Sequence, residues 1–291
     1  MKTWGDIISL TADYLAGKCV PDASVAAELL AARLLKCGRG FLAPHLSQVP
    51  DERHLEAMRR GMARLAKGEP VQYVLGEWDF RRLTLGCDRR ALIPRPETEE
   101  LVTRVLKFMR ARWPGEGNAE PPMVVDVGTG TGCIVLSLAD EFAGAANFLG
   151  IDISADAVAL ARENAARCGL AERVKFAVTD GLDDFDEPEM IDVLVSNPPY
   201  IPTAVCDTLD PRIRDFEPRN ALDGGSEGLD FYERLVGDAL NLLKPGGGVF
   251  FEIGDEQGPA LQKMLFGAGF DDIRIEKDYA GHDRYASAVL P

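Results

Sequence analysis

Asn197-Pro198-Pro199-Tyr200 has the residue types needed to hold a planar nitrogen. An Asn side chain offers a carbonyl acceptor, and Pro198 keeps its main-chain carbonyl while having no N–H of its own. Two acceptors that converge on one –NH2 group would fix both of its hydrogens, and Tyr200 would offer a flat face for the substrate to stack on. Taken alone, the tetrapeptide is equally typical of a loop, because Asn-Pro and Pro-Pro are ordinary turn dipeptides.

The tetrapeptide directly follows the apolar run Val193-Leu194-Val195, which predicts a buried strand of a parallel sheet. It therefore lies at the carboxyl end of a strand, where open α/β sheets bind their ligands. Further strands are expected at 123–127, 148–152, 174–178, 249–253, 273–275 and 285–290, with helices at 133–142, 154–168, 229–243 and 257–267. This alternation predicts a parallel sheet covered by helices on both faces.

A glycine turn, Gly128-Thr129-Gly130-Thr131-Gly132, follows the first of these strands, and Asp152 ends the next one, 24 residues after Gly128. Such a turn lets a ligand approach the backbone, and a strand-end carboxylate can hold ribose hydroxyls at a spacing of about 20 residues. The G-x-G-x-G pattern is tighter than the one that cradles a pyrophosphate, which indicates a ligand without phosphates. S-adenosylmethionine fits, with its ribose on Asp152, its base near Asp180 and Gly181, and its methionine part over the glycines.

The first seventy residues carry three helical patterns that begin at Thr3, Ser24 and Asp51 and predict a small bundle. Nothing in this bundle has catalytic residue types, so we expect it to contact a partner. From Val71 the period changes and predicts short strands, including one at Val71–Val74, in a hairpin that links two domains. Proline-flanked Arg95 then leads into a helix over residues 97–112.

Composition and charge exclude several classes of protein. Apolar residues make up 46% and charged residues 27% of the 291 residues, which is typical of a globular protein. No apolar run is long enough for a membrane span, so we expect a soluble cytoplasmic protein, with a monomer as the default. The net charge of −15 argues against nucleic acid as a partner and fits a small molecule or a basic protein.

The residues that commonly bind metals are scattered along the chain. The six cysteines form no C-x-x-C pair, and His45, His54 and His282 are isolated, so we expect reduced thiols, structural or surface histidines and no metal site.

Four longer segments resemble the HemK/PrmC family of protein-(glutamine N5) methyltransferases, which modify the glutamine of the GGQ loop in class I peptide-chain release factors. The segments are GEPVQYVLG (68–76), LIPRPETE (92–99), FEPRNALDGG (216–225) and FEIG (251–254). The match extends over essentially the whole chain.

The resemblance implies a helical docking domain for the release factor (1–70), a β-hairpin linker (71–93) and a class I S-adenosylmethionine-dependent methyltransferase domain of Rossmann-like fold (94–291). It implies cofactor contacts at Gly128 to Gly132, Asp152 and Asn197, and a glutamine site at Asn197 to Tyr200. Gly181 departs from the family, where a bulky residue is common, so a backbone or Leu182 contact to adenine is the alternative there. The PRPET segment is expected either to wall the site or to act as a stiff linker, and a role for Arg95 is left open.

Three other functions fit parts of the pattern. A glutamine methyltransferase of a ribosomal protein would use the same site. An adenine-N6 methyltransferase of nucleic acid would present an equally planar nitrogen to Asn197, with Tyr200 stacked on a flipped base. A non-catalytic cofactor-binding or adaptor protein would bind the cofactor without turnover.

Overall fold

The computed structural model describes residues 2–114 and 120–291. The chain divides into two compact units, one made of the residues up to Glu77 with Asp210–Phe216 and the other of Trp78–Leu209 with Glu217–Pro291. Residues 114–122 are rich in glycine and proline, a composition that predicts a connector, and they lie partly outside the described residues. Within the described ranges, no helix combines the length and apolar character required to cross a bilayer.

Helices make up the first unit: α1 (Trp4–Gly17), α2 (Ala23–Leu35), α3 (Glu52–Leu65), α4 (Val71–Leu75) and α9 (Pro211–Arg214), with 3₁₀ turns at Arg39–Phe41 and Ala43–His45. Two of the predicted helix starts are confirmed. Thr3 and Asp6 form a capping box on α1, and the Asp51 carboxylate accepts the main-chain N–H of His54 at the start of α3. The second helix begins at Ala23, one residue before the predicted start.

The strand predicted at Val71–Val74 is wrong, because these residues form helix α4. Gly76, at a φ of 74°, ends the helix by donating its N–H to the Gln72 carbonyl. The Arg64 guanidinium donates to the main-chain carbonyls of Tyr73 (3.0 Å) and Val74 (3.3 Å). These bonds satisfy carbonyls that have no partner within a helix of five residues. The apolar pattern of residues 71–74 does not indicate them, because Arg64 lies outside the segment.

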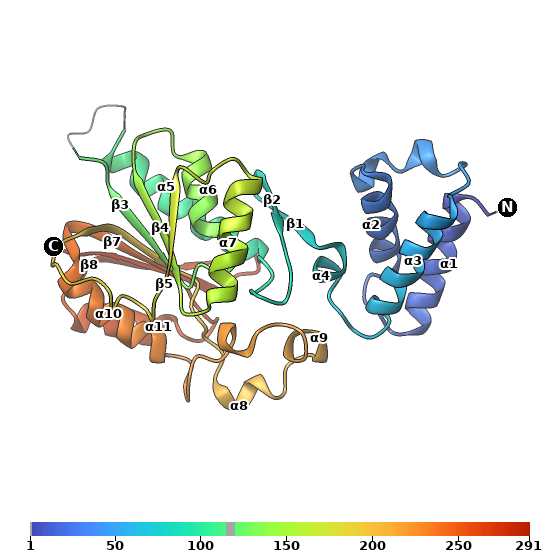
Figure 1. Cartoon of the computed structure of the whole chain (residues 1–291). Helices are drawn as coiled ribbons and strands as arrows, with labels where there is room; N and C mark the ends of the chain where they lie inside the picture. The colour runs from blue at the N-terminus through green and yellow to red at the C-terminus, as the bar shows by residue number, and fades with distance from the viewer. Residues whose placement is uncertain (1, 115–119) are drawn as a thin grey trace. The chain divides into compact units, whose positions relative to one another are not determined.

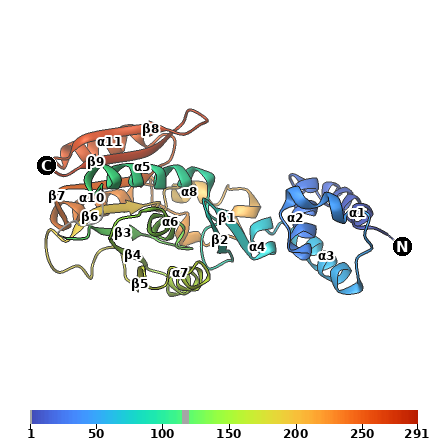
Figure 2. The same cartoon turned by 90° about the horizontal axis from the view of Figure 1, so that it is seen from above.

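A seven-stranded sheet forms the centre of the second unit, in the order β5-β4-β3-β6-β7-β9-β8, which Figure 2 shows from β5 at the bottom to β8 at the top. The strands are β3 (Met123–Val127), β4 (Asn147–Asp152), β5 (Val174–Val178), β6 (Ile191–Ser196), β7 (Leu243–Glu252), β8 (Asp271–Lys277) and β9 (Asp283–Val289). Strand β9 runs antiparallel to β7 and β8, so the prediction of a wholly parallel sheet is wrong at this edge. The short connection from β8 to β9 leaves no room for a crossover and allows only a hairpin.

Helices cover both faces of the sheet (Figure 1). They are α5 (Pro96–Arg112), α6 (Cys133–Glu141) and α7 (Ala155–Arg167) on one face and α10 (Asp230–Leu242) and α11 (Gly258–Gly267) on the other, with a short α8 (Thr203–Cys206) and a 3₁₀ turn at Arg219–Ala221 in the loops. Val193 and Val195 of β6 pack with α5 and α6, whereas Leu194 packs with α10 and α11. The continuous apolar run predicted as a buried strand is therefore covered on both sides.

Strands β1 (Glu77–Phe80) and β2 (Leu83–Gly86) form the predicted hairpin. Asn164 of α7 accepts the N–H of Gly86 (2.6 Å) and donates to its carbonyl (3.1 Å). Arg81, in the turn, pairs with Glu141 at the end of α6. These contacts fix the end of the hairpin on the second unit, so the chain that leaves β2 enters the unit at a defined place.

Candidate active site

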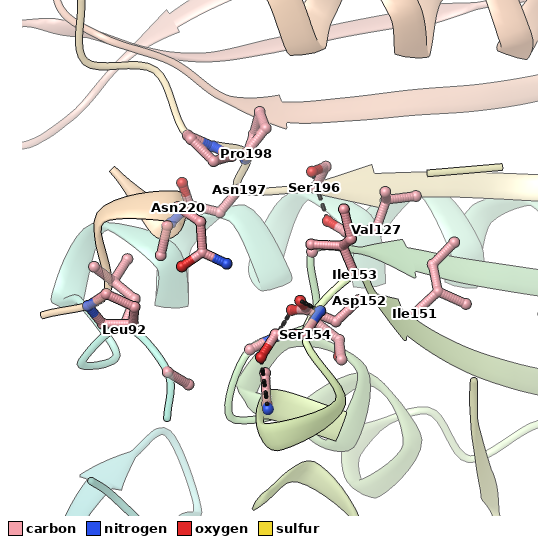
Figure 3. Close-up of a pocket in the computed structure, with 18 of the residues that line it drawn as sticks. Leu92, Val127, Ile151, Asp152, Ile153, Ser154, Ser196, Asn197, Pro198 and Asn220 are labelled. Carbon is pink, nitrogen blue, oxygen red and sulfur yellow. Dashed lines mark hydrogen bonds between the residues drawn. The ribbon is translucent and has the colours of Figure 1, made fainter. Parts of the chain in front are cut away.

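A cavity of about 460 Å³ lies at the carboxyl ends of β3, β4, β5 and β6, a volume in the range of small-molecule sites (Figure 3). Its lining residues come from segments far apart in the chain: 90–95, Thr98, 127–131, Cys133, Ile134, 151–154, Ala157, 179–181, 196–199, Pro218, Asn220, Ala221, Asp223, Phe231, Arg234 and Leu235. The predicted glycine turn, strand-end acids and Asn197-Pro198-Pro199 thus meet in one place. Two of the predicted site residues, Gly132 and Tyr200, do not line the cavity.

The glycine turn owes its shape to positive φ angles, 72° at Gly128, 56° at Gly130 and 81° at Gly132, which a side chain would strain. Its second residue, Thr129, donates to the buried Asp126 carboxylate of β3 (2.7 Å). Burial raises the pKa of Asp126 to about 7. The sequence had assigned Asp126 only to a strand, and the structure shows that it ties the turn to the sheet.

Asp152, at the end of β4, accepts the main-chain N–H of Gly130 (3.0 Å) with one carboxylate oxygen and that of Ser154 (2.9 Å) with the other. Burial raises its pKa. A carboxylate has about four acceptor positions, so two remain for ribose hydroxyls. Ile153, which is 59% exposed, adds an apolar surface for a flat base beside them (Figure 3). The free acceptor positions of Asp152 and the apolar surface of Ile153 therefore fit the ribose and the base of an adenosine.

Arg234 of α10 explains the departure at Gly181. Its guanidinium binds the Asp180 carboxylate (2.5 Å), the Asp180 carbonyl (2.6 Å) and Asp183 (2.7 Å). A Cβ on Gly181 would lie 3.0 Å from this guanidinium. A side chain at position 181 would therefore crowd the arginine, and the φ of 59° would strain it as well. Leu182, the alternative adenine contact, is buried in the core and does not line the cavity.

Asn197 directly follows β6, and two hydrogen bonds fix its position, one from Ser196 and one from its own side chain. Ser196 donates to the Val127 carbonyl of β3 (2.7 Å), which ties the two strand ends together (Figure 3). The side-chain –NH2 of Asn197 donates to the Thr98 hydroxyl (3.1 Å) on α5. The Asn197 amide oxygen is thereby left for the cavity.

The PRPET segment lines the cavity, so the wall interpretation is the one that its placement supports. Glu217 is buried and accepts both the guanidinium of Arg95 (2.5 Å) and the main-chain N–H of Ile93 (3.1 Å). The half-buried Arg95 and the buried Glu217 thus join the segment 92–95 to the segment that contains Asn220. Asn220 lies beside Asn197 at the cavity (Figure 3), and the sequence had not singled it out.

Tyr200 does not line the cavity with its three predecessors. Its ring packs with the core under α10, and burial raises its pKa to about 12. The Tyr200 carbonyl accepts from the Gln257 side chain (3.0 Å), which anchors the loop. The structure thus gives Tyr200 a packing role, and a stacking contact with substrate stays a prediction.

The sheet order, the glycine turn after its first strand and the acid that ends the second define a class I methyltransferase fold. The solved catalytic domain of hMettl16 in complex with a MAT2A 3′UTR hairpin has the same fold, with a TM-score of 0.56 and 15% identity over 82% of each chain. The delta-N METTL16 methyltransferase domain gives a TM-score of 0.51 at 18% identity, over 72% of this chain and 88% of that one. At these identities the likeness concerns the fold alone.

Two family models match the chain: "PrmC N-terminal domain" at residues 6–76 and "Methyltransferase domain" at residues 122–265. The release factor glutamine methyltransferase of Chlorobaculum tepidum is 36% identical over 99% of this chain and 98% of its own length. That of Caulobacter vibrioides is 41% identical over 78% and 76%, and that of Geobacter sulfurreducens 37% identical over 96% and 93%. The chain belongs to the release factor glutamine methyltransferase family.

Proposed function

We propose that this protein transfers a methyl group from S-adenosylmethionine to the side-chain amide nitrogen of the glutamine in the GGQ loop of class I release factors. The observation that carries the proposal is the Asn197 amide, whose –NH2 is engaged by Thr98 and whose oxygen is left for a donor in the cavity. A primary amide of glutamine is such a donor. The substrate's identity rests on the names of the relatives, which align over most of the chain.

The cofactor would be held by the glycine turn, Asp152, Ile153 and the Asp180-Gly181 backbone. S-adenosylmethionine supplies a methyl group on a positively charged sulfur, which keeps the bonding electron pair when the methyl leaves.

The protein's task is to prepare a poor nucleophile, because resonance delocalises the lone pair of an amide nitrogen. We infer that Asn197 and the Pro198 carbonyl accept the two N–H groups of the glutamine amide, pin its nitrogen and stabilise the positive charge that develops on it. The nitrogen then loses one proton readily, since an N-methylated amide that carries this charge is very acidic. No strong base is required, which agrees with a cavity whose described lining contains no histidine and no lysine.

We also propose that the helical domain of residues 1–70 docks the release factor. The net charge of −15 would speed encounter with a substrate that carries basic surface for ribosomal RNA. The association rate constant, measured by stopped flow, is expected to fall as salt rises from about 50 to 300 mM. A rate constant that does not respond to salt would argue against steering.

The test of the function is a methyl-transfer assay with labelled S-adenosylmethionine and four acceptors in parallel. They are a release factor, its GGQ-loop Gln→Ala variant, the ribosomal protein substrate and duplex DNA. We expect label on the intact release factor alone. Label on the ribosomal protein or on DNA would keep the site chemistry and overturn the substrate, and cofactor binding without label on any acceptor would favour a binding protein.

A further inference from the structure

Asn197 is one end of a hydrogen-bonded chain of three side chains from three separate elements. Its –NH2 donates to the Thr98 hydroxyl of α5 (3.1 Å), and that hydroxyl donates to the Glu252 carboxylate at the end of β7 (2.6 Å). Thr98 is 2% and Glu252 1% exposed. Little solvent therefore reaches the Thr98–Glu252 bond, and buried polar groups of this kind bond to protein partners.

The direction of the chain follows from the supply of protons. An ionised carboxylate only accepts hydrogen bonds, so Glu252 takes the single hydroxyl proton of Thr98. The Thr98 oxygen can then only accept, and among the described residues the –NH2 end of Asn197 is the side-chain donor that reaches it. The two ends of an Asn amide have nearly the same shape, so packing alone does not choose between them. The chain from Glu252 does.

We propose that Thr98 and Glu252 are positioning residues that hold the amide oxygen of Asn197 toward the substrate nitrogen. A reversed amide would present its –NH2 to the –NH2 of the substrate, and two donors cannot bond to each other. The preorganised acceptor for the developing positive charge would be lost, while the cavity would keep its shape. This inference rests on the proposed function and assigns it two residues outside the NPPY motif.

The ionisation of Glu252 controls the chain. Burial raises its pKa to about 7, against the lowering effects of the Thr98 hydrogen bond and of Arg284. The titratable and charged groups that act on it or face it are Arg95, Glu97, Cys133, Tyr200, Tyr232, Arg284 and Tyr285. Below this pKa the carboxyl carries a proton that it can donate to Thr98, which frees the hydroxyl to donate to Asn197. We therefore expect kcat to fall as the pH drops through about 7.

Substitution of Thr98 separates positioning from packing. Thr98→Val keeps the shape and removes the hydroxyl, so kcat for methyl transfer should fall about 10- to 100-fold, with cofactor Kd unchanged. Thr98→Ser keeps the hydroxyl and should retain most of the activity. Thr103→Val makes the same chemical change at an exposed position of α5 outside the cavity and should leave kcat unchanged. Wild-type kcat in Thr98→Val, or equal losses in the Val and Ser variants, would overturn the proposal.

Glu252→Gln tests the source of the direction. A Gln side chain can either accept from Thr98 or donate to it, so the direction is no longer imposed. We expect a lower kcat without the decline near pH 7 that the wild type shows. A variant whose pH profile matches the wild type would remove Glu252 from the proposal. Thermal unfolding of each variant identifies any that fail to fold.

Nuclear magnetic resonance of the ¹⁵N-labelled, full-length protein tests the chain without any methyl acceptor. The –NH2 signal of Asn197, assigned by its loss in Asn197→Ser, should exchange slowly with solvent in the wild type and fast in Thr98→Val. Equal exchange rates would overturn the inference even if the wild type methylates a release factor. Slow exchange in a protein that methylates no release factor would overturn the proposed function and leave the hydrogen bonds from Glu252 through Thr98 to Asn197 in place.

Discussion

The two sides of the cavity are built in different ways. On the cofactor side, which we define as Gly128–Thr131 with Asp152, main-chain N–H groups and strand-end carboxylates supply most of the contacts. The Thr129 hydroxyl bonds Asp126 three residues away, and the Gly130 N–H bonds Asp152 only 22 residues away. These contacts form as soon as two neighbouring βα units come together.

The substrate side, which we define as Asn197, Thr98 and Glu252, depends on side chains that meet across the fold. Asn197 and Thr98 are 99 residues apart, and Thr98 and Glu252 are 154 apart. The main-chain groups of the cofactor side fix where a ligand lies. The hydrogen bonds among the three side chains of the substrate side fix which end of the Asn197 amide faces the ligand. Changes on the first side should therefore alter affinity, and changes on the second should alter turnover.

The largest effect is expected on the substrate side. Asn197→Ala removes a preorganised acceptor for charge that develops in the transition state, so single-turnover methyl transfer should slow about 100-fold or more. Calorimetric Kd for S-adenosylhomocysteine serves as the control and should change far less. Normal turnover by a folded Asn197→Ala protein would contradict both the mechanism and the contrast between the two sides.

On the cofactor side, Asp152→Ala should act on binding. Losing one charge-assisted hydrogen bond to a ribose hydroxyl costs about 1.5–3 kcal/mol, so Kd for S-adenosylhomocysteine should rise at least about 10- to 100-fold. At saturating cofactor, kcat should recover most of its value. A kcat defect that saturation does not relieve would show that Asp152 also positions the reacting atoms, and the division between the two sides would fail.

The same contrast explains what the sequence could predict. The glycine turn, Asp152 and most of the sheet strands follow from local periodicity and fixed spacing and lie close to where expected, although β7 begins at Leu243, six residues before its predicted start. The Thr98–Glu252 bond and the Arg95–Glu217 pair have no local signal. The partners are 154 and 122 residues apart, so the sequence around one partner does not indicate the other. Only the family-like segments that contain these four residues pointed to them.

Local pattern failed for two further reasons. Helix α4 replaced a predicted strand because Arg64, outside the segment, satisfies its carbonyls. Strand β9 reversed the expected direction because a short hairpin connection decides orientation, whatever the apolar pattern of the strand.

One contact next to the cofactor side, between Arg234 and Asp180, spans the fold although it lies at the expected place of the cofactor, and it offers the finest test. Arg234 reaches Asp180 from 54 residues away, and its guanidinium lies 3.0 Å from the place of a Cβ on Gly181. Gly181→Ala introduces both this contact and strain at a φ of 59°, so Kd for S-adenosylhomocysteine should rise severalfold.

A double-mutant cycle with Arg234→Ala separates the two causes of this loss. If the guanidinium occupies the place of the missing side chain, the double variant should bind the cofactor better than the sum of the single effects predicts. Strict additivity would mean that backbone strain alone accounts for the glycine. In that case Arg234 would be only a surface partner of Asp180 and Asp183, and every contact that holds the cofactor would come from the strand ends and the turn.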